Sequence, residues 1–129
     1  MPEGLATGSF EVSLTPATVP DPAIGAMTIA KTFRGDLDGT SAGLMLSAGA
    51  PASGSAGYVA MERVTGALAG RRGGFALQHS GTMDKGAMTL SVQVSPGSGT
   101  EGLAGISGAM EIVASPGRHE YRFRYALPD

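Results

Sequence analysis

The sequence predicts an all-β fold, an eight-stranded antiparallel β-barrel, and three observations support this prediction. Glycine supplies 21 and proline 8 of the 129 residues, together well above the roughly 12% of an average chain. No segment free of both exceeds ten residues, whereas a typical helix needs about 11–12. Between these breaks, apolar and polar residues alternate with the period of a strand. A helical bundle and a doubly wound α/β fold are excluded, and 42% hydrophobic residues argue against disorder.

The first four expected strands are bounded by glycine or proline. Gly8–Thr15 alternates apolar with polar residues and is followed by a proline-rich connection. Ala26–Arg34 repeats the alternation, Gly39–Ala48 follows, and Ser55–Thr65 ends before a glycine. This spacing is typical of strands joined by short turns.

The last four expected strands complete the barrel. Gly74–Thr82 and Ala87–Ser95 are followed by Leu103–Val113, whose internal glycines predict bulges or bends. His119–Leu127 places its aromatic residues on one face and its charges on the other. Residues 1–129 are therefore expected to form one antiparallel, lipocalin-like meander. An open two-sheet sandwich is the alternative.

Composition narrows the possible functions. The chain has no cysteine and a net charge of −2, so disulfides, thiolate chemistry and a basic nucleic-acid footprint are not expected. The start, Met1-Pro2-Glu3-Gly4, lacks the features of a signal peptide, and no apolar run approaches a membrane span. We expect a cytoplasmic protein that contacts neither membrane nor nucleic acid and needs no cofactor.

The hairpin formed by the fourth and fifth strands contains the candidate catalytic residues Glu62 and His79. A turn at Gly70–Gly73 would place Val64 opposite His79 and Glu62 opposite Gly81. The two candidates then become diagonal neighbours on the apolar face, with backbones roughly 7–8 Å apart. A slip by one residue would move every side chain to the other face.

A buried carboxylate beside an imidazole allows three interpretations. The pair could transfer protons, since burial and pairing shift both groups toward neutral pH. It could anchor a polar group of a ligand, or it could be an internal polar cluster that fixes strand register. Lys31 lies among apolar neighbours and is expected to extend to the barrel rim; the alternative is that it neutralises Glu62.

Further residues are expected around this pair. The expected lining of the cavity is Lys31, Tyr58, Phe75, Leu77, Tyr121, Phe123 and Tyr125. The methionines on apolar faces (Met27, Met83, Met88 and Met110) are expected to fill the core. Two histidines and one carboxylate without close spacing give no metal site. Apolar residues on the outer face, Val59 and Met61, favour a homo-oligomer.

Several segments, in order, carry a family resemblance. They are Lys31–Ser41, Gly57–Gly66, Gly74–Met83, Ser98–Thr100, Leu103–Met110 and the ending with His119, Tyr121, Phe123 and Tyr125. This chain resembles the bacterial family called domain of unknown function 3224 along nearly its whole length. The resemblance implies an eight-stranded barrel similar to allene oxide cyclase. The Glu and His of the family match Glu62 and His79, with no agreed activity attached to them.

Three functions follow as hypotheses. The first is binding of a small hydrophobic molecule in the barrel, with Glu62 and His79 as polar anchors. The second is a cofactor-independent cyclase or isomerase in which the same pair moves a proton. The third is a structural or assembly protein whose lumen is filled by side chains. A cavity of about 300 Å³ or more would favour the first two.

Overall fold

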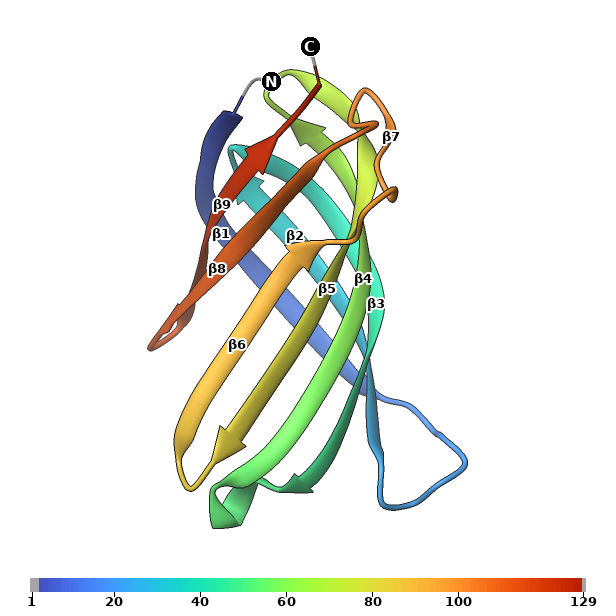
Figure 1. The fold of residues 1–129 in the computed structure, drawn as a ribbon, viewed down its shortest axis with the longest axis vertical. Coiled ribbons are helices and arrows are strands. Elements are labelled where there is room, and N and C mark those ends of the chain that lie inside the picture. The colour runs from blue at the N-terminus through green and yellow to red at the C-terminus, as the bar shows by residue number, and fades with distance from the viewer. Residues whose placement is uncertain (1–2, 129) are drawn as a thin grey trace.

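The computed structural model describes residues 3–128, apart from the side chain of Ser115. Met1, Pro2 and Asp129 of the expected domain lie outside the described residues. Within them, nine strands and one short 3-10 helix are formed (Figure 1). The elements are β1 (Glu3–Pro16), β2 (Gly25–Gly35), β3 (Leu37–Ala50), η1 (Pro51–Ser53), β4 (Ser55–Leu68), β5 (Arg71–Asp84), β6 (Ala87–Val94), β7 (Thr100–Glu101), β8 (Ser107–Ser115) and β9 (Arg118–Ala126).

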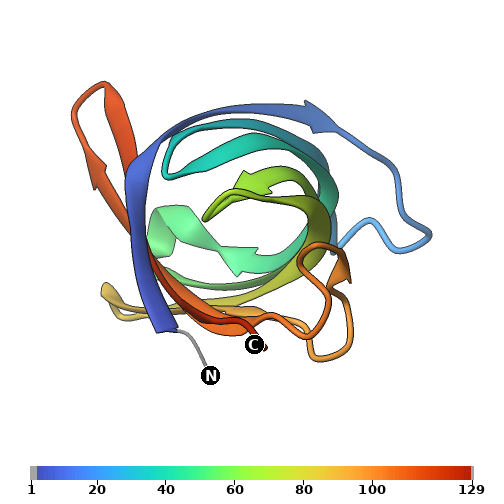
Figure 2. The same ribbon diagram turned by 90° about the horizontal axis from the view of Figure 1, so that it is seen from above.

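Eight of these strands close into an antiparallel barrel, which confirms the predicted fold and rules out the open sandwich. Their order is β4-β3-β2-β1-β9-β8-β6-β5, and β5 pairs back onto β4. Figure 2 shows the resulting ring from above. The short β7 is an extra strand that pairs with β5 at Gly73 and Gly74.

The ring is joined unevenly. β6 and β8 are bridged by a single residue pair, Gln93 and Ala109, whereas the other neighbouring strands share long ladders. The ladder between β1 and β9 ends at Ser9 and Glu120. Beyond these points the β8–β9 hairpin turns away from the rest of the ring, as Figures 1 and 2 show. The pairings of β9 with β1 and of β8 with β6 thus lie in the upper half, while Ile112 and His119 of the hairpin still line the interior of the lower half.

The upper half is filled by side chains. The largest residues with under 2% exposure are Tyr121, Phe33, Phe75, Phe123, Leu37, Leu68, Leu77 and Leu103. The rings of Phe75 and Phe123 stack at 5.6 Å between centroids, although their strands, β5 and β9, are not neighbours in the ring. Burial of each such side chain stabilises the fold by about 1.5–3 kcal/mol. This packed half holds the strands that carry the site below it.

Tyr121 joins β9 to the turn between β2 and β3. Its hydroxyl oxygen accepts a hydrogen bond from the Leu37 N–H at 2.9 Å. The hydroxyl lies 3.0 Å from the Arg34 carbonyl oxygen and 3.1 Å from that of Leu37, to which it can donate. Burial and the charges of Asp36 and Asp38 raise the pKa of Tyr121, although the Leu37 hydrogen bond opposes them. The hydroxyl therefore keeps its proton and acts as both donor and acceptor.

Two expectations about turns are wrong. The β4–β5 turn is Ala69-Gly70, with φ of 54° and 77°, the geometry of a two-residue type I′ hairpin. It is not the Gly70–Gly73 loop, because Gly73 lies within β5, where it pairs with β7. A Cβ at Gly73 would collide with the carbonyl oxygen of Thr100. That glycine serves a close approach of two backbones rather than a turn.

The seventh expected strand, Leu103–Val113, also differs. β8 begins only at Ser107, because Leu103 and Ile106 belong to tight turns. Their N–H groups donate to the carbonyl oxygens of Thr100 and Leu103 respectively. Both side chains are buried. The segment covers the packed upper end of the barrel instead of adding to its wall.

Tyr121→Phe should lower the free energy of unfolding by about 1–3 kcal/mol, because the buried Leu37 N–H loses its acceptor. Urea denaturation measures the change. Tyr125→Phe is the matched control, since it removes a hydroxyl from the same strand without affecting the Arg34–Leu37 turn. An equal loss in both variants would contradict the proposed role of Tyr121.

Candidate functional site

Four polar side chains form a row across neighbouring strands of the inner wall. They are Lys31 on β2, Ser41 on β3, Glu62 on β4 and His79 on β5. Lys31 is opposite Ser41, and Glu62 is opposite Leu77 while His79 is opposite Ala60. Glu62 and His79 are therefore diagonal neighbours. The alternation of each strand turns all four side chains inward.

The expected register of this hairpin is wrong, although the two side chains still meet. Glu62 is opposite Leu77, not Gly81. The ladder is displaced by four residues because the chain turns earlier than expected. An even displacement leaves every side chain on its original face, so both residues remain inside the barrel.

Glu62 lies at the centre of the row. Its Oε2 is 2.9 Å from Lys31 Nζ and 3.3 Å from His79 Nε2. The three residues are 1%, 7% and 6% exposed respectively. Within the described residues, neither carboxylate oxygen nor His79 Nε2 has a well-directed hydrogen bond, and the same holds for Ser41 Oγ. Lys31 and Glu62 are held together by the attraction between opposite charges at short range.

Burial alone would raise the pKa of Glu62, because an apolar interior disfavours charge. His79 and Lys31 outweigh burial, and together they lower that pKa below its ordinary value of 4.5. Glu62 is therefore a carboxylate at neutral pH. Burial, followed by the charge of Glu62, raises the pKa of Tyr58, so its phenol stays protonated.

Lys31 corrects another expectation. Its ammonium does not reach the rim; it pairs with Glu62 inside the barrel. Nζ also lies 4.8 Å from the ring centroid of Phe10 and 5.8 Å from that of Phe33. Aromatic faces attract a cation, so these rings and the carboxylate together stabilise the charged form of Lys31.

The lower half of the barrel contains a hollow in two adjoining parts, and the inner part reaches this row. Its outer part has a volume of about 420 Å³ and is lined by Met45, Tyr58, Met83, Met88 and Leu90, among others. Its inner part, of about 170 Å³, is lined by Lys31, Tyr58, Ala60, His79 and residues of β1, β2, β8 and β9. Met45 and Tyr58 line both parts, which adjoin along these two side chains. We name the two parts together the lower hollow.

Lys31 and His79 line the lower hollow, whereas Glu62 does not. The carboxylate lies behind them. The ring of Tyr58 covers Gly81 on the next strand, where a Cβ would collide with it. Tyr58 and His79 have ring centroids 6.5 Å apart. A molecule in the hollow would therefore meet the imidazole, the ammonium and the phenol, each held from behind.

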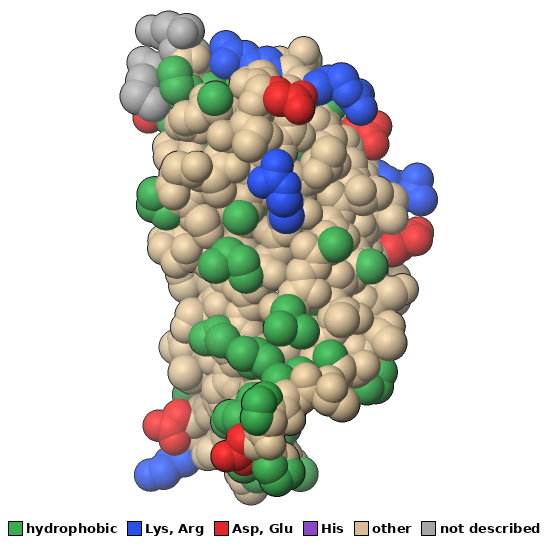
Figure 3. All heavy atoms as spheres, turned by 90° about the vertical axis from the view of Figure 1, so that its right-hand side faces the viewer, with side chains coloured by type: hydrophobic (Ala, Val, Ile, Leu, Met, Phe, Trp, Pro, Cys, Tyr) green, Lys and Arg blue, Asp and Glu red, His purple; other side chains and the backbone are tan. Residues whose placement is uncertain are grey.

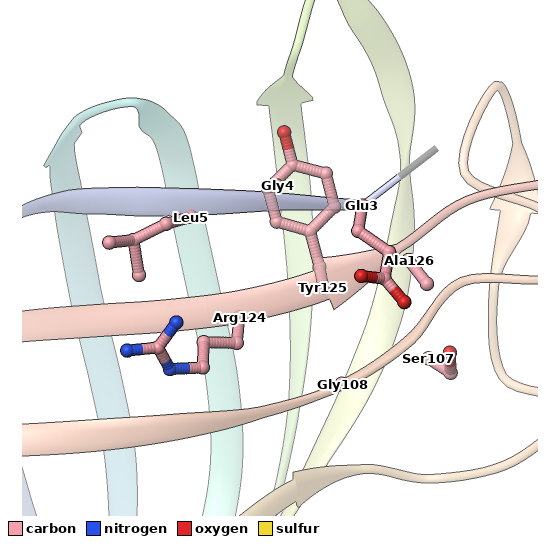
Figure 4. A pocket seen from close by; sticks show the side chains of 8 residues that line it. All are labelled: Glu3, Gly4, Leu5, Ser107, Gly108, Arg124, Tyr125 and Ala126. Atoms are coloured by element: carbon pink, nitrogen blue, oxygen red, sulfur yellow. The ribbon is translucent and has the colours of Figure 1, made fainter. Parts of the chain in front are cut away.

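The structure does not bring the other expected lining residues to the lower hollow. Phe75, Leu77, Tyr121 and Phe123 are fully buried in the packed upper half. Tyr125 lies at the upper end, beside Gly4 (Figure 4). Of the methionines expected in the core, Met110 is buried there, while Met83 and Met88 line the outer part of the hollow.

Sequence reasoning missed Ser41, Met45 and Leu90. Each occupies a position whose side chain points into the barrel by the alternation along its strand, and this alternation was the available signal. The exposure of inward positions was not foreseeable from parity: Met88 is 77% and Leu14 47% exposed. These positions are uncovered because the β8–β9 hairpin turns away from them.

Two further surface features lie outside the lower hollow. A hollow of about 450 Å³ crosses the upper ends of β1, β9 and β8 and is lined by Glu3, Leu5 and Arg124, among others (Figure 4). It contains none of the clustered polar groups. On the outer wall, Leu44 is paired with Met61, and Leu46 with Val59. Figure 3 shows hydrophobic side chains gathered on the lower half of one side of the barrel.

Residues 3–128 contain no group of three His, Cys, Asp or Glu side chains placed to hold a metal ion. The same residues form no helix long and apolar enough to cross a membrane.

Comparison with known proteins shows the family and the fold of this chain. The family described as proteins of unknown function, DUF3224, matches residues 6–125. This chain belongs to the DUF3224 family. A crystal structure of a DUF3224 protein of unknown function from Shewanella oneidensis MR-1 is similar, with 41% identity, a TM-score of 0.91 and 99% coverage of each chain. No curated protein matches the chain. The DUF3224 barrel is thus shown by both family and fold.

Lys31→Met should lower the free energy of unfolding at pH 7 by about 3–5 kcal/mol, because Glu62 would lose its strongest counter-charge while buried. The double variant Lys31→Met, Glu62→Gln should recover much of this loss, since no charge remains to be compensated. Urea denaturation of the two variants and of Glu62→Gln completes the cycle. Additive losses would show that the pair is not coupled.

The stabilising effect of the Glu62 charge should disappear in acid. Because its pKa in the folded protein lies below 4.5, its contribution is complete above that pH and falls as pH drops through the folded value. The difference in free energy of unfolding between wild type and Glu62→Gln should therefore shrink below about pH 4.5. A difference that is constant from pH 7 to pH 3 would contradict this.

Proposed function

We propose that this protein binds a small hydrophobic molecule in the lower hollow, with His79 and Lys31 as the polar groups it meets. The observation that carries the proposal is an apolar cavity of about 420 Å³ that adjoins, along Met45 and Tyr58, a smaller hollow lined by Lys31 and His79. Ligand pockets typically have about 300–1,000 Å³ and a few converging polar groups. The third hypothesis, a wholly filled lumen, fits only the upper half.

Glu62 acts in this proposal as a positioning residue. It lies behind Lys31 and His79 and holds both at short distance. The orientation of each anchoring group is then set before a ligand arrives, which lowers the entropy lost on binding. Buried ion pairs contribute little net stability, so a role in binding gives a physical reason for their presence here.

A cofactor-independent cyclase or isomerase is the second candidate. The observation that favours it is the 3.3 Å contact between Glu62 and His79, in which a carboxylate can orient an imidazole for proton transfer. The pKa of Glu62 is lowered, so its carboxylate is a weak base. In this candidate His79 is therefore the group that transfers the proton. The expected likeness to allene oxide cyclase supports this candidate by analogy alone.

Filling the outer part of the lower hollow should abolish binding. Ala56 faces inward and lines it, so Ala56→Phe should weaken the binding of an uncharged fluorescent probe, N-phenylnaphthylamine, by at least about tenfold through steric exclusion. Ala42→Phe, which makes the same change on an exposed outward position, is the matched control. Urea denaturation shows whether each variant is folded.

Binding that is unchanged in Ala56→Phe, or absent in wild type, would overturn the proposed site. To separate binding from catalysis, molecules retained by the purified protein are identified by native mass spectrometry and incubated again with wild type and His79→Ala. An isomer of equal mass that appears by chromatography only with wild type would favour the second candidate.

Self-association remains a proposal of its own. Val59 and Met61 are each about half exposed on the outer wall, and such apolar surface is often covered in an assembly. Sedimentation of wild type and of Met61→Lys would decide whether this face joins two copies.

A further inference from the structure

The lower hollow differs in character from its mouth to its inner end. The side chains around the mouth are thioethers and aliphatic groups, including Met45, Met83, Met88 and Leu90. Methionine adapts to irregular apolar shapes. Because the hollow is open toward the lower end of the barrel, this part suits a flexible apolar tail rather than a rigid polar molecule.

The inner end is polar but nearly neutral. The positive charge of Lys31 lies 2.9 Å from the negative charge of Glu62, so the two largely cancel. The Tyr58 phenol keeps its proton. An anionic head group would be repelled by Glu62, and a cationic one by Lys31. Neither charge would find a free counter-ion there, and burying an uncompensated charge is costly.

The hydrogen-bonding groups at the inner end favour one functional group. His79 Nε2 lies 3.3 Å from Glu62 Oε2, which leaves Nδ1 as the ring nitrogen available to a ligand. Nδ1 accepts a hydrogen bond when it carries no proton. Tyr58 supplies a hydroxyl donor on the same wall. A group that both donates to Nδ1 and accepts from a phenol or ammonium satisfies all of these, and a hydroxyl is the smallest such group.

We propose that the lower hollow takes an uncharged amphiphile in which a single hydroxyl group is attached to an apolar tail. The inference rests on the proposed binding function and names the class of ligand. The hydroxyl lies among His79, Lys31 and Tyr58, and the tail extends past the methionines to the open lower end. Glu62 contributes by orienting His79 and by neutralising Lys31.

The test compares four compounds that share one tail: decanol, decanoate, decylamine and decyl methyl ether. Each displaces N-phenylnaphthylamine from wild type at pH 7. Decanol should bind about fivefold more tightly than the ether, which lacks a donor, as expected for about 1 kcal/mol from one hydrogen bond. It should bind at least about tenfold more tightly than the two charged compounds.

Variants connect this preference to the named residues. His79→Leu should reduce the affinity for decanol to that for the ether and leave the ether unchanged. Tyr58→Phe keeps the ring over Gly81 and should reduce the same ratio, which gives a second reading where His79→Leu is destabilised. Tyr125→Phe, an inward tyrosine of the upper end, is the matched control and should leave the ratio unchanged.

The negative results of this test distinguish a failure of the hydroxyl proposal from a failure of the proposed binding function. Equal binding of all four compounds, or tightest binding of decanoate or decylamine, would overturn the hydroxyl proposal while binding in the hollow stands. Displacement by none of them, although the probe binds, would also overturn it. If neither probe nor compounds bind wild type, the proposed function itself fails.

Discussion

A buried carboxylate that must remain charged is the constraint around which the inner wall is arranged. Glu62 is almost fully covered, and its ionised form is kept by Lys31 and His79 on the two sides. These partners come from different strands, so their contacts depend on correct pairing of β2 through β5. The packed upper half supplies that pairing. In return, the cluster places an ammonium and an imidazole at the end of an otherwise apolar hollow.

The alternation of apolar and polar residues in the sequence was sufficient to predict the barrel and the contact between Glu62 and His79. The exact register was wrong, because Gly70–Gly73 resembles a turn by composition although Gly73 admits the backbone of β7. The prediction of the pair survived since the error was an even number of residues. Side-chain direction in a strand is thus more robust to a misplaced turn than residue pairing is.

What sequence could not predict depends on contacts between distant segments. Lys31 was expected at the rim, with neutralisation of Glu62 as the alternative, and the alternative is correct; the sequence of one strand could not decide between them, because Glu62 lies two strands away. Phe75 and Phe123 were expected around a cavity, but the chain folds Leu103 and Ile106 over them and fills that end. The location of the hollow follows from where β9 leaves β1, which no local pattern encodes.

The single bridge between Gln93 and Ala109 has a mechanical consequence. A force that widens the barrel separates first the two strands that share the fewest pairings. Every other pair of neighbouring strands in this ring shares a long ladder. An occupant too bulky for the lower hollow would therefore part β6 from β8 before it disturbed the row of polar groups on β2 through β5. The wall of the lower hollow would then be stiff along β2 through β5, which share long ladders, and would yield only where β6 meets β8.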